Sequence, residues 1–438
     1  MCPVPSPSDT STTPRTRGAD VLRSATRVLR SWPALWVGFL VVHGWIIVQA
    51  WVFGGQILGD VGLYEWWVRT GMNDGWWPVF GYDWVYPLGA LGPMAVPALL
   101  SSSSDGYSWV WMILVTLANA VAVALLGRAR PHGRAAVWFW LAFLAALGPI
   151  WIGRLDGLLA PIILVALLVA VRRPAVAMTL ATIGAWIKIA PGAVALALAA
   201  TSSDVRRLLR TVVLPGAAVT AVVVGVAFAG GGQDNVLDVF GEQGERQLQV
   251  EAVGATPFTV ARLWDPSIRV EYDDVIYTYE VLGEAPDAVA QALDVALPVA
   301  ALLLAALVWW AARRRPDRVG DVLLLGATAE LLALIVFNKV GSPQFIAWIG
   351  PPLAAAIALG SRSQGTRRTW FLPALGTLVV ARLTMEIYPI RYGEFLGGWP
   401  LATTVGALRN ALLVVLLVGV VVRLVQLTRT RRAVSRPR

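Results

Sequence analysis

Apolar residues recur along the chain in runs of roughly 20, separated by short stretches rich in arginine or in acidic residues. A helix of about 20 apolar residues crosses a hydrocarbon core of about 30 Å. Helices satisfy their own backbone groups in lipid, as isolated strands cannot. The pattern predicts an all-α polytopic membrane protein with about twelve transmembrane helices, at 34–53, 108–126, 135–150, 157–171, 175–187, 191–200, 211–229, 289–311, 322–337, 345–359, 370–385 and 401–422.

One further apolar stretch, residues 88–100, is interrupted by two glycines and two prolines. If it crossed the membrane, the arginines after it would lie on the outer side, against the usual distribution of positive charge. We therefore expect an interfacial helix within a first external loop, residues 54–107. The remaining divisions that we predict are a second external loop at 230–288, a membrane domain at 34–423, and basic cytoplasmic tails at 1–33, disordered, and 424–438.

Composition agrees with the membrane class, because 57% of the 438 residues are hydrophobic and only 14% are charged. The net charge of +9 would suit a nucleic-acid partner, but the arginines form short clusters beside span ends, as in the positive-inside pattern. We expect a multi-pass plasma-membrane protein with cytoplasmic termini and no nucleic-acid partner. The lone cysteine, Cys2, excludes an internal disulfide. The clusters lie at 128–134, 172–173, 206–210, 313–318, 362–368 and 423–438.

A carboxylate, Asp60, follows the first span directly, where a helix has just left the bilayer. Two interpretations are open. Asp60 caps a helix over residues 61–70, since aspartate is a favoured N-cap, or it is a functional carboxylate. Aromatic residues follow it in the same loop, and Tyr64, Trp84 and Tyr86 suit stacking on a sugar or hydrogen bonding to it.

Two lysines, Lys188 and Lys339, are the only ones among 36 basic residues, and both lie at predicted external span ends close to a proline. Positive charge on the outer side opposes the topology rule. One explanation is snorkelling toward headgroup phosphates. The other is that these compact cations bind a substrate phosphate. Arg154, also external and next to Asp156, would join them.

Signals for other cofactors are missing from the sequence. There is no Walker-type loop and no dinucleotide fingerprint. His43 has no second histidine nearby, and no zinc-type spacing occurs. We therefore expect no nucleotide, metal or other cofactor, and a lipid-carried substrate on the outer side, where nucleotides are scarce.

The ordered motifs along the chain resemble membrane glycosyltransferases of the GT-C type, most closely glycosyltransferase family 87. That family includes polyprenol-phosphate-mannose-dependent α-1,2-mannosyltransferases of actinobacterial lipid glycans. In such enzymes an aspartate of the first external loop is the catalytic base, which corresponds to Asp60. The stretches that carry the resemblance are Gly59-Asp60-Val-Gly-Leu-Tyr64, Tyr86-Pro87-Leu88, Gly153-Arg-Leu-Asp156-Gly-Leu-Leu, Gly184-Ala-Trp-Ile-Lys188-Ile-Ala-Pro191 and Lys339-Val-Gly-Ser-Pro343-Gln344-Phe345.

Two departures from the family pattern bear on the chemistry. Arg154 stands where members commonly have glutamine, and this difference bears on which substrate the enzyme accepts. The first loop also lacks an adjacent acidic pair of the kind that holds a metal in other GT-C enzymes, so metal-independent chemistry is expected.

The resemblance implies an inverting transfer of a sugar, most commonly mannose, from a polyprenyl-phosphate donor to a lipid-linked glycan, glycolipid or lipoglycan acceptor. With Asp60 as base, we expect Lys188, Lys339 and Arg154 to hold the donor phosphate. The residues expected to contact the sugar or the acceptor are Tyr64, Glu65, Trp84, Tyr86, Asp156, Glu251 and Gln344.

A secondary transporter or flippase of a lipid-linked sugar is the alternative. Twelve spans and the intramembrane charges of Glu330 and Arg409 suit such a protein. Against it, the long loops and the unusual lysines fall on one face, whereas alternating access needs a site near the midplane.

Overall fold

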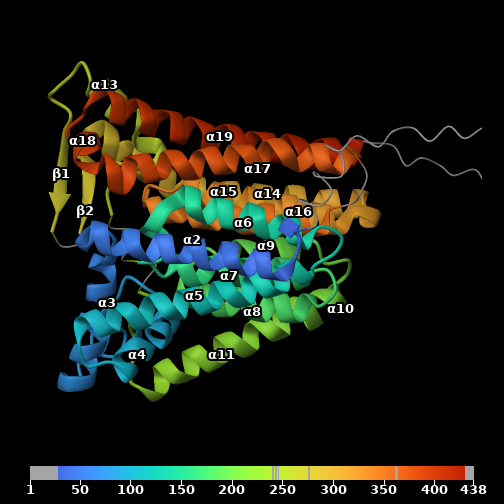
Figure 1. Ribbon diagram of the computed structural model, residues 1–438, viewed down its shortest axis with the longest axis horizontal. Helices are drawn as coiled ribbons and strands as arrows, with labels where there is room; N and C mark the ends of the chain where they lie inside the picture. Colours follow the sequence, from blue (N-terminus) through green and yellow to red (C-terminus); the bar gives the residue numbers. More distant parts are fainter. Residues whose placement is uncertain are drawn as a thin grey trace, which may run out of the picture.

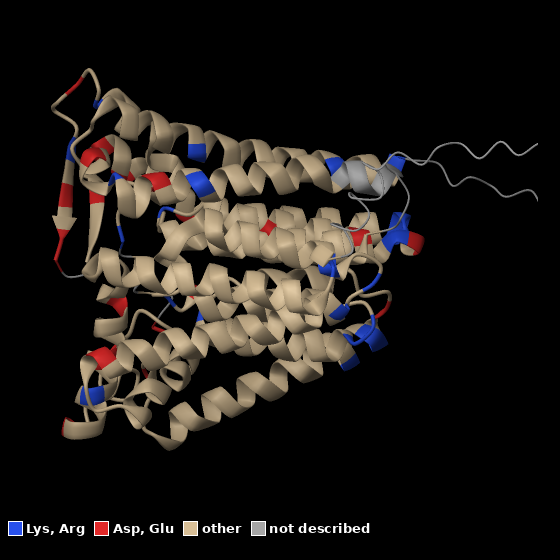
Figure 2. Ribbon diagram, in the orientation of Figure 1, with Lys and Arg blue, Asp and Glu red and all other residues tan. Residues whose placement is uncertain are grey.

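The computed structural model describes residues 28–238, 241, 244, 246–274, 277–360 and 364–429, with the side chains of 364–369 left aside. Most of the predicted basic tails lies outside these residues. The described chain forms a bundle of roughly parallel and antiparallel helices (Figure 1). We call the end that carries α3, α4 and the strands the loop end, and the opposite end, where α10 lies and arginines gather, the basic end (Figures 1 and 2).

The helices and strands follow one another in chain order, with short 3₁₀ and π turns labelled η. They are α2 (Trp32–Phe53), α3 (Gly55–Asp74), η1 (Leu88–Ala90), α4 (Leu91–Leu100), α5 (Ser104–Arg128), α6 (Gly133–Leu147), η2 (Gly148–Trp151), α7 (Asp156–Val169), α8 (Pro174–Ile187), α9 (Gly192–Ala200), α10 (Val205–Leu208), η3 (Leu209–Val213), α11 (Leu214–Ala229), η4 (Val253–Ala255), α13 (Thr256–Ala261), β1 (Arg269–Asp273), β2 (Thr278–Leu282), α14 (Glu284–Arg314), η5 (Pro316–Arg318), α15 (Val319–Val336), η6 (Pro343–Trp348), α16 (Gly350–Leu359), α17 (Gln364–Met385), η7 (Glu386–Ile390), α18 (Tyr392–Leu396) and α19 (Pro400–Arg429).

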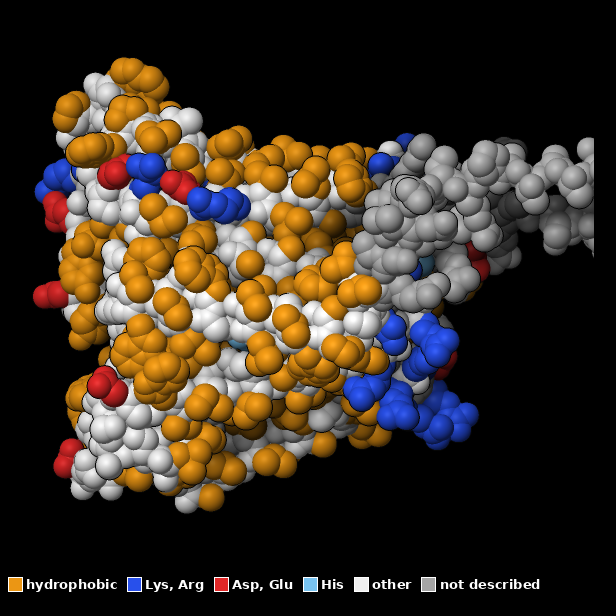
Figure 3. Space-filling model, in the orientation of Figure 1, with side chains coloured by type: hydrophobic (Ala, Val, Ile, Leu, Met, Phe, Trp, Pro, Cys, Tyr) orange, Lys and Arg blue, Asp and Glu red, His pale blue; other side chains and the backbone are white. Residues whose placement is uncertain are grey.

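Each of the twelve predicted spans falls mainly on helical residues. Within the described chain, eight helices, taken with their adjoining turns, are long and apolar enough to cross a membrane. The predicted spans at α7, α8, α9 and η6–α16 are shorter. The all-α polytopic class is confirmed, while the number of crossings and the GT-C assignment stay predictions. Hydrophobic side chains cover the flank of the bundle between its two ends (Figure 3), as a lipid-facing surface requires.

The helices α7 and α8 stop inside the bundle. The helix α7 ends, and α8 begins, at the turn that contains Arg172, at the basic end. Each of the two helices has 14 residues. At 1.5 Å per residue such a helix is about 21 Å long, which is shorter than a hydrocarbon core of about 30 Å. At their other ends, Asp156 is fully buried and the Lys188 side chain is only 13% exposed.

The capping interpretation of Asp60 is wrong. The helix around it, α3, begins at Gly55, and its N-cap is Gly54 with φ of +51°. A glycine in this left-handed region ends α2 and reverses the chain at once, so α3 starts earlier than the aspartate pattern indicated. Asp60 is consequently an interior residue of α3, and its side chain is available for other contacts.

Two features of the loops complete the fold. The stretch predicted as an interfacial helix contains η1 and α4, and α4 has only ten residues; its position at the interface stays a prediction. The predicted external loop 230–288 contains an antiparallel hairpin of β1 and β2, in which Glu271 pairs with Glu280. This hairpin was not predicted, and it is the one departure from an all-α fold in the described chain.

Candidate active site

Asp60 and Arg154 form the first half of the site. Arg154 lies in the turn between η2 and α7, and its Nε is 2.8 Å from Asp60 Oδ2. The turn lies against α3 because Gly153 has no side chain; a Cβ there would lie 2.1 Å from the Ile57 carbonyl oxygen. Arg154 is buried, whereas the Asp60 side chain is 33% exposed. The Asp60 carboxylate thus contacts the Arg154 guanidinium and is also partly exposed to solvent.

Backbone carbonyl groups hold the Arg154 guanidinium in place. Nη1 donates to the carbonyls of Ile57 at 2.6 Å and Gly153 at 3.1 Å, and Nη2 donates to that of Gln56 at 3.3 Å. The Nε–H is not directed at the carboxylate, although the two groups are close. The contact with Asp60 is therefore an ion pair without an aligned hydrogen bond. The carboxylate oxygens of Asp60 remain able to accept hydrogen bonds from other groups.

Asp156 and Lys188 form the second half. Asp156, at the first turn of α7, is fully buried and accepts hydrogen bonds from Lys188 Nζ at 2.8 Å and Trp348 Nε1 at 2.6 Å. The Lys188 side chain is 13% exposed. Its ammonium lies 4.8 Å from the centre of the Phe345 ring, in a cation–π arrangement. Two of its three N–H donors are left over from the bond to Asp156.

Tyrosines adjoin these charges. The Tyr64 hydroxyl accepts a hydrogen bond from the Leu155 amide at 3.4 Å, between Arg154 and Asp156 in the chain. Its ring contacts that of Tyr86 edge to face, with 6.3 Å between centroids. Burial raises the pKa of both hydroxyls above their ordinary value. Both tyrosines therefore stay neutral at physiological pH and cannot act as the base.

Glu251 belongs to a neighbouring cluster. It is buried, and it accepts a hydrogen bond from the Tyr392 hydroxyl at 2.6 Å. Burial raises the pKa of this carboxyl. The Tyr392 ring contacts that of Tyr388, 4.8 Å away, and the Tyr388 hydroxyl donates to the Gln56 carbonyl, which Arg154 also contacts. A chain of tyrosines thus joins Glu251 to the Asp60 region.

Lys339 lies elsewhere than Lys188. Its Nζ pairs with Asp294 on α14 at 2.8 Å and donates to the Gly244 carbonyl at 2.7 Å. The turn after it lies against the loop of Glu251, because Gly341 has no side chain; a Cβ there would lie 2.1 Å from the Ala252 nitrogen. No contact joins Lys339 to Lys188 within the part of the chain that the structure describes.

Three other predicted residues have separate surroundings. Glu65 is buried against Arg69, whose Nε lies 2.6 Å away and whose Nη2 donates to the Ser101 carbonyl. Trp84 is buried against Tyr86, with 5.5 Å between ring centroids, and its indole N–H has no hydrogen-bond partner in the described chain. Gln344 is half-buried one residue before Phe345. The roles predicted for them stay predictions.

Sequence reasoning missed Trp348, Tyr388 and Tyr392. Aromatic residues near span ends are so common that none of the three stood out. One signal existed: Tyr388-Pro389, just after the predicted span 370–385, repeats the tyrosine–proline pair Tyr86-Pro87 of the first external loop.

Metal-binding side chains do not converge in the described ranges, where no group of three His, Cys, Asp or Glu could hold an ion. Metal independence stays an expectation.

Comparison with known protein families identifies the family of this chain. The model of glycosyltransferase family 87 matches residues 84–337, more than half of the 438. The match includes Arg154, Asp156 and Lys188, while Asp60 and Lys339 lie outside it. No curated protein and no solved structure matches the chain. The chain belongs to glycosyltransferase family 87 and is a membrane glycosyltransferase.

Proposed function

We propose that this enzyme transfers a sugar, mannose in the first place, from a polyprenyl-phosphate donor to a lipid-linked glycan or glycolipid on the external face of the plasma membrane. One observation carries the proposal: the ion pairs Asp60–Arg154 and Asp156–Lys188 are neighbours, since Arg154 and Asp156 stand two residues apart in the turn that leads into α7. Membership of a glycosyltransferase family favours this function over the transporter alternative.

Asp60 acts as the general base in this proposal. Of the two aspartates it is the one that is open to solvent, since Asp156 is fully buried and already accepts hydrogen bonds from Lys188 and Trp348. A base must come within about 3 Å of the hydroxyl that it deprotonates. Arg154 orients the Asp60 carboxylate, because three carbonyls fix its guanidinium.

Lys188 receives the donor phosphate. Its two remaining N–H donors and its charge suit a phosphate oxygen. Its side chain is 13% exposed, so the ammonium can be reached from outside the bundle. We keep Lys339 as a second proposed phosphate contact, although in the structure it is separate from Lys188 and pairs with Asp294.

The reaction is a single displacement with inversion. The acceptor oxygen attacks the anomeric carbon, its proton passes to Asp60, and the bond from that carbon to the phosphate oxygen breaks. Polyprenyl phosphate leaves as an anion that Lys188 stabilises. In this proposal Lys188, and not a metal ion, neutralises the leaving group.

Purified enzyme tests the proposal directly. It is incubated with polyprenyl-phosphate mannose and a membrane glycolipid extract, and products are identified by mass spectrometry. We expect a glycolipid one hexose heavier, with the anomeric configuration inverted. Transfer from a nucleotide-activated mannose instead, or retention of configuration, would contradict the proposal.

A further inference from the structure

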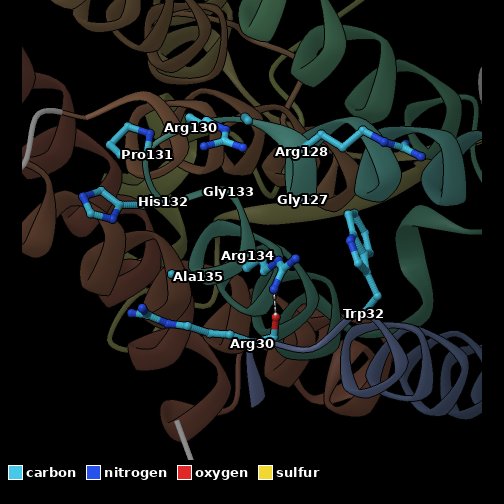
Figure 4. A pocket seen from close by; sticks show the side chains of 11 residues that line it. Arg30, Trp32, Gly127, Arg128, Arg130, Pro131, His132, Gly133, Arg134 and Ala135 are labelled. Carbon is cyan, nitrogen blue, oxygen red and sulfur yellow. Dashed lines mark hydrogen bonds between the residues drawn. The ribbon is translucent and has the colours of Figure 1, made fainter. Parts of the chain in front are cut away.

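A cavity of about 540 Å³ lies at the basic end, far from the candidate active site. The start of α2 and the turn between α5 and α6 form it (Figure 4). Four arginines and one tryptophan are among the side chains that line it: Arg30, Arg128, Arg130, Arg134 and Trp32.

These arginines have no carboxylate partner among the described residues. Arg134 donates to the Arg30 carbonyl at 2.6 Å, and Arg128 donates to the Ala124 carbonyl at 3.2 Å. Most of their N–H donors have no partner among the described residues, since a guanidinium carries five. Four cations around one cavity repel one another unless an anion compensates them.

Trp32 gives the cavity a defined wall. The guanidinium carbons of Arg128 and Arg134 lie 5.6 and 5.7 Å from the centre of its ring. The ring fits against α5 because Gly127 has no side chain; a Cβ there would lie 2.7 Å from it. Topology alone requires positive charge at this end of a membrane protein but no such arrangement around a cavity.

An apolar stripe on α5 leads from the cavity toward the middle of the bundle. Leu125 and Val121 precede Arg128 by three and seven residues, so the three lie on one face of the helix. Leu125 is 40% and Val121 58% exposed. An anion that entered with an acyl chain would find an apolar surface directly below its headgroup, whereas a soluble anion would not use it.

We propose that this cavity binds the headgroup phosphate of an anionic phospholipid from the leaflet at the basic end. The guanidinium groups pair with the phosphate oxygens, and an acyl chain lies along the stripe of Leu125 and Val121. The site is independent of the glycosyl-transfer reaction, which takes place at the opposite end.

Lipid retention in native mass spectrometry tests the site. The protein in neutral detergent is titrated with dioleoyl phosphatidylglycerol or dioleoyl phosphatidylcholine. The pocket variant is Arg128→Gln/Arg130→Gln/Arg134→Gln. The matched control removes the same charge from the same end outside the cavity, as Arg206→Gln/Arg207→Gln/Arg210→Gln.

Wild type and control should bind phosphatidylglycerol more tightly than phosphatidylcholine. The pocket variant should lose about 100-fold in phosphatidylglycerol affinity, because each basic residue near an anionic lipid contributes a factor of about five. If that variant misfolds, the corresponding triple Lys variant should still show weaker, severalfold reduced binding, since lysine keeps the charge without the planar fork.

Three results would overturn the proposal. They are unchanged phosphatidylglycerol binding by the pocket variant, an equal loss in the control, and displacement of the lipid by millimolar inorganic phosphate. The last would make the cavity a site for soluble anions.

Discussion

Removing the charge of Lys188 should destabilise the protein far more than removing that of Lys339. Lys188→Met leaves Asp156 as a carboxylate with no exposed surface and only Trp348 as a donor. Breaking a buried ion pair by removing one partner costs about 3–5 kcal/mol, since the remaining charge is desolvated and uncompensated. We expect a loss in this range.

Lys339→Met is the matched comparison, because Lys339 is also buried and its Nζ–carboxylate distance is also 2.8 Å. Its partner differs: the Asp294 side chain is 46% exposed and stays solvated when the lysine is lost. The loss is then mainly that of the hydrogen bond to Gly244, about 1 kcal/mol.

A double variant separates the pair from the rest of the fold. Lys188→Met/Asp156→Asn leaves no unpaired charge, so it should be more stable than Lys188→Met alone, with a coupling energy of about 2–3 kcal/mol. Unfolding of detergent-solubilised protein, followed by tryptophan fluorescence against denaturant, gives the values. Equal losses in the two Met variants, or strict additivity in the double variant, would refute the reasoning.

Two further predictions concern topology and pH. With Cys2 replaced by serine, Ser267→Cys should react with an impermeant maleimide in intact cells, and Ser203→Cys only after permeabilisation; the reverse pattern would invert the orientation. Burial raises the pKa of Glu251 in the folded protein above the ordinary carboxyl value of about 4.3. As the pH rises from that ordinary value through the raised pKa, ionisation of Glu251 therefore lowers the stability of the folded state. Glu251→Gln should therefore raise the melting temperature increasingly over that window, and the exposed Glu271→Gln should not. A pH-independent difference would contradict this assignment.

The helices were predictable because long apolar runs dominate the sequence, and each predicted span falls mainly on helical residues. Local signals misled at Asp60, where the capping preference of aspartate was weighed without the chain reversal at Gly54. The hairpin of β1 and β2 was not predicted, because two strands of five residues in a long loop give little periodic pattern of apolar and polar residues.

The ion pairs of the site lay beyond sequence reasoning. Lys188 and Arg154 were predicted as phosphate ligands because positive charge on the external side of the membrane is unusual, and that signal comes from the predicted topology. Their partners depend on how α3, α7 and α8 pack, and Asp156 and Lys188 are 32 residues apart in the chain. The part played by Trp348, from η6, depends on contacts still further apart, since it reaches Asp156 across 192 residues.

The most direct test of the proposed mechanism is sugar transfer by purified Asp60→Asn. Asparagine keeps the shape of the side chain, and the carbonyls of Gln56, Ile57 and Gly153 still hold Arg154. Because Arg154 is buried and loses its anionic partner, this variant should be less stable than the wild type, so transfer is measured on the folded fraction. Loss of a general base typically lowers the rate about 10²- to 10⁴-fold. We predict a folded protein that binds the polyprenyl-phosphate donor but loses transfer to this extent.

The control is Asp321→Asn at the basic end, where the carboxylate also pairs with an arginine Nε, that of Arg318 at 2.5 Å, and is similarly exposed. This variant should transfer sugar at the wild-type rate. Near wild-type transfer by folded Asp60→Asn, or an equal loss in the Asp321 variant, would contradict the assignment of Asp60 as the base.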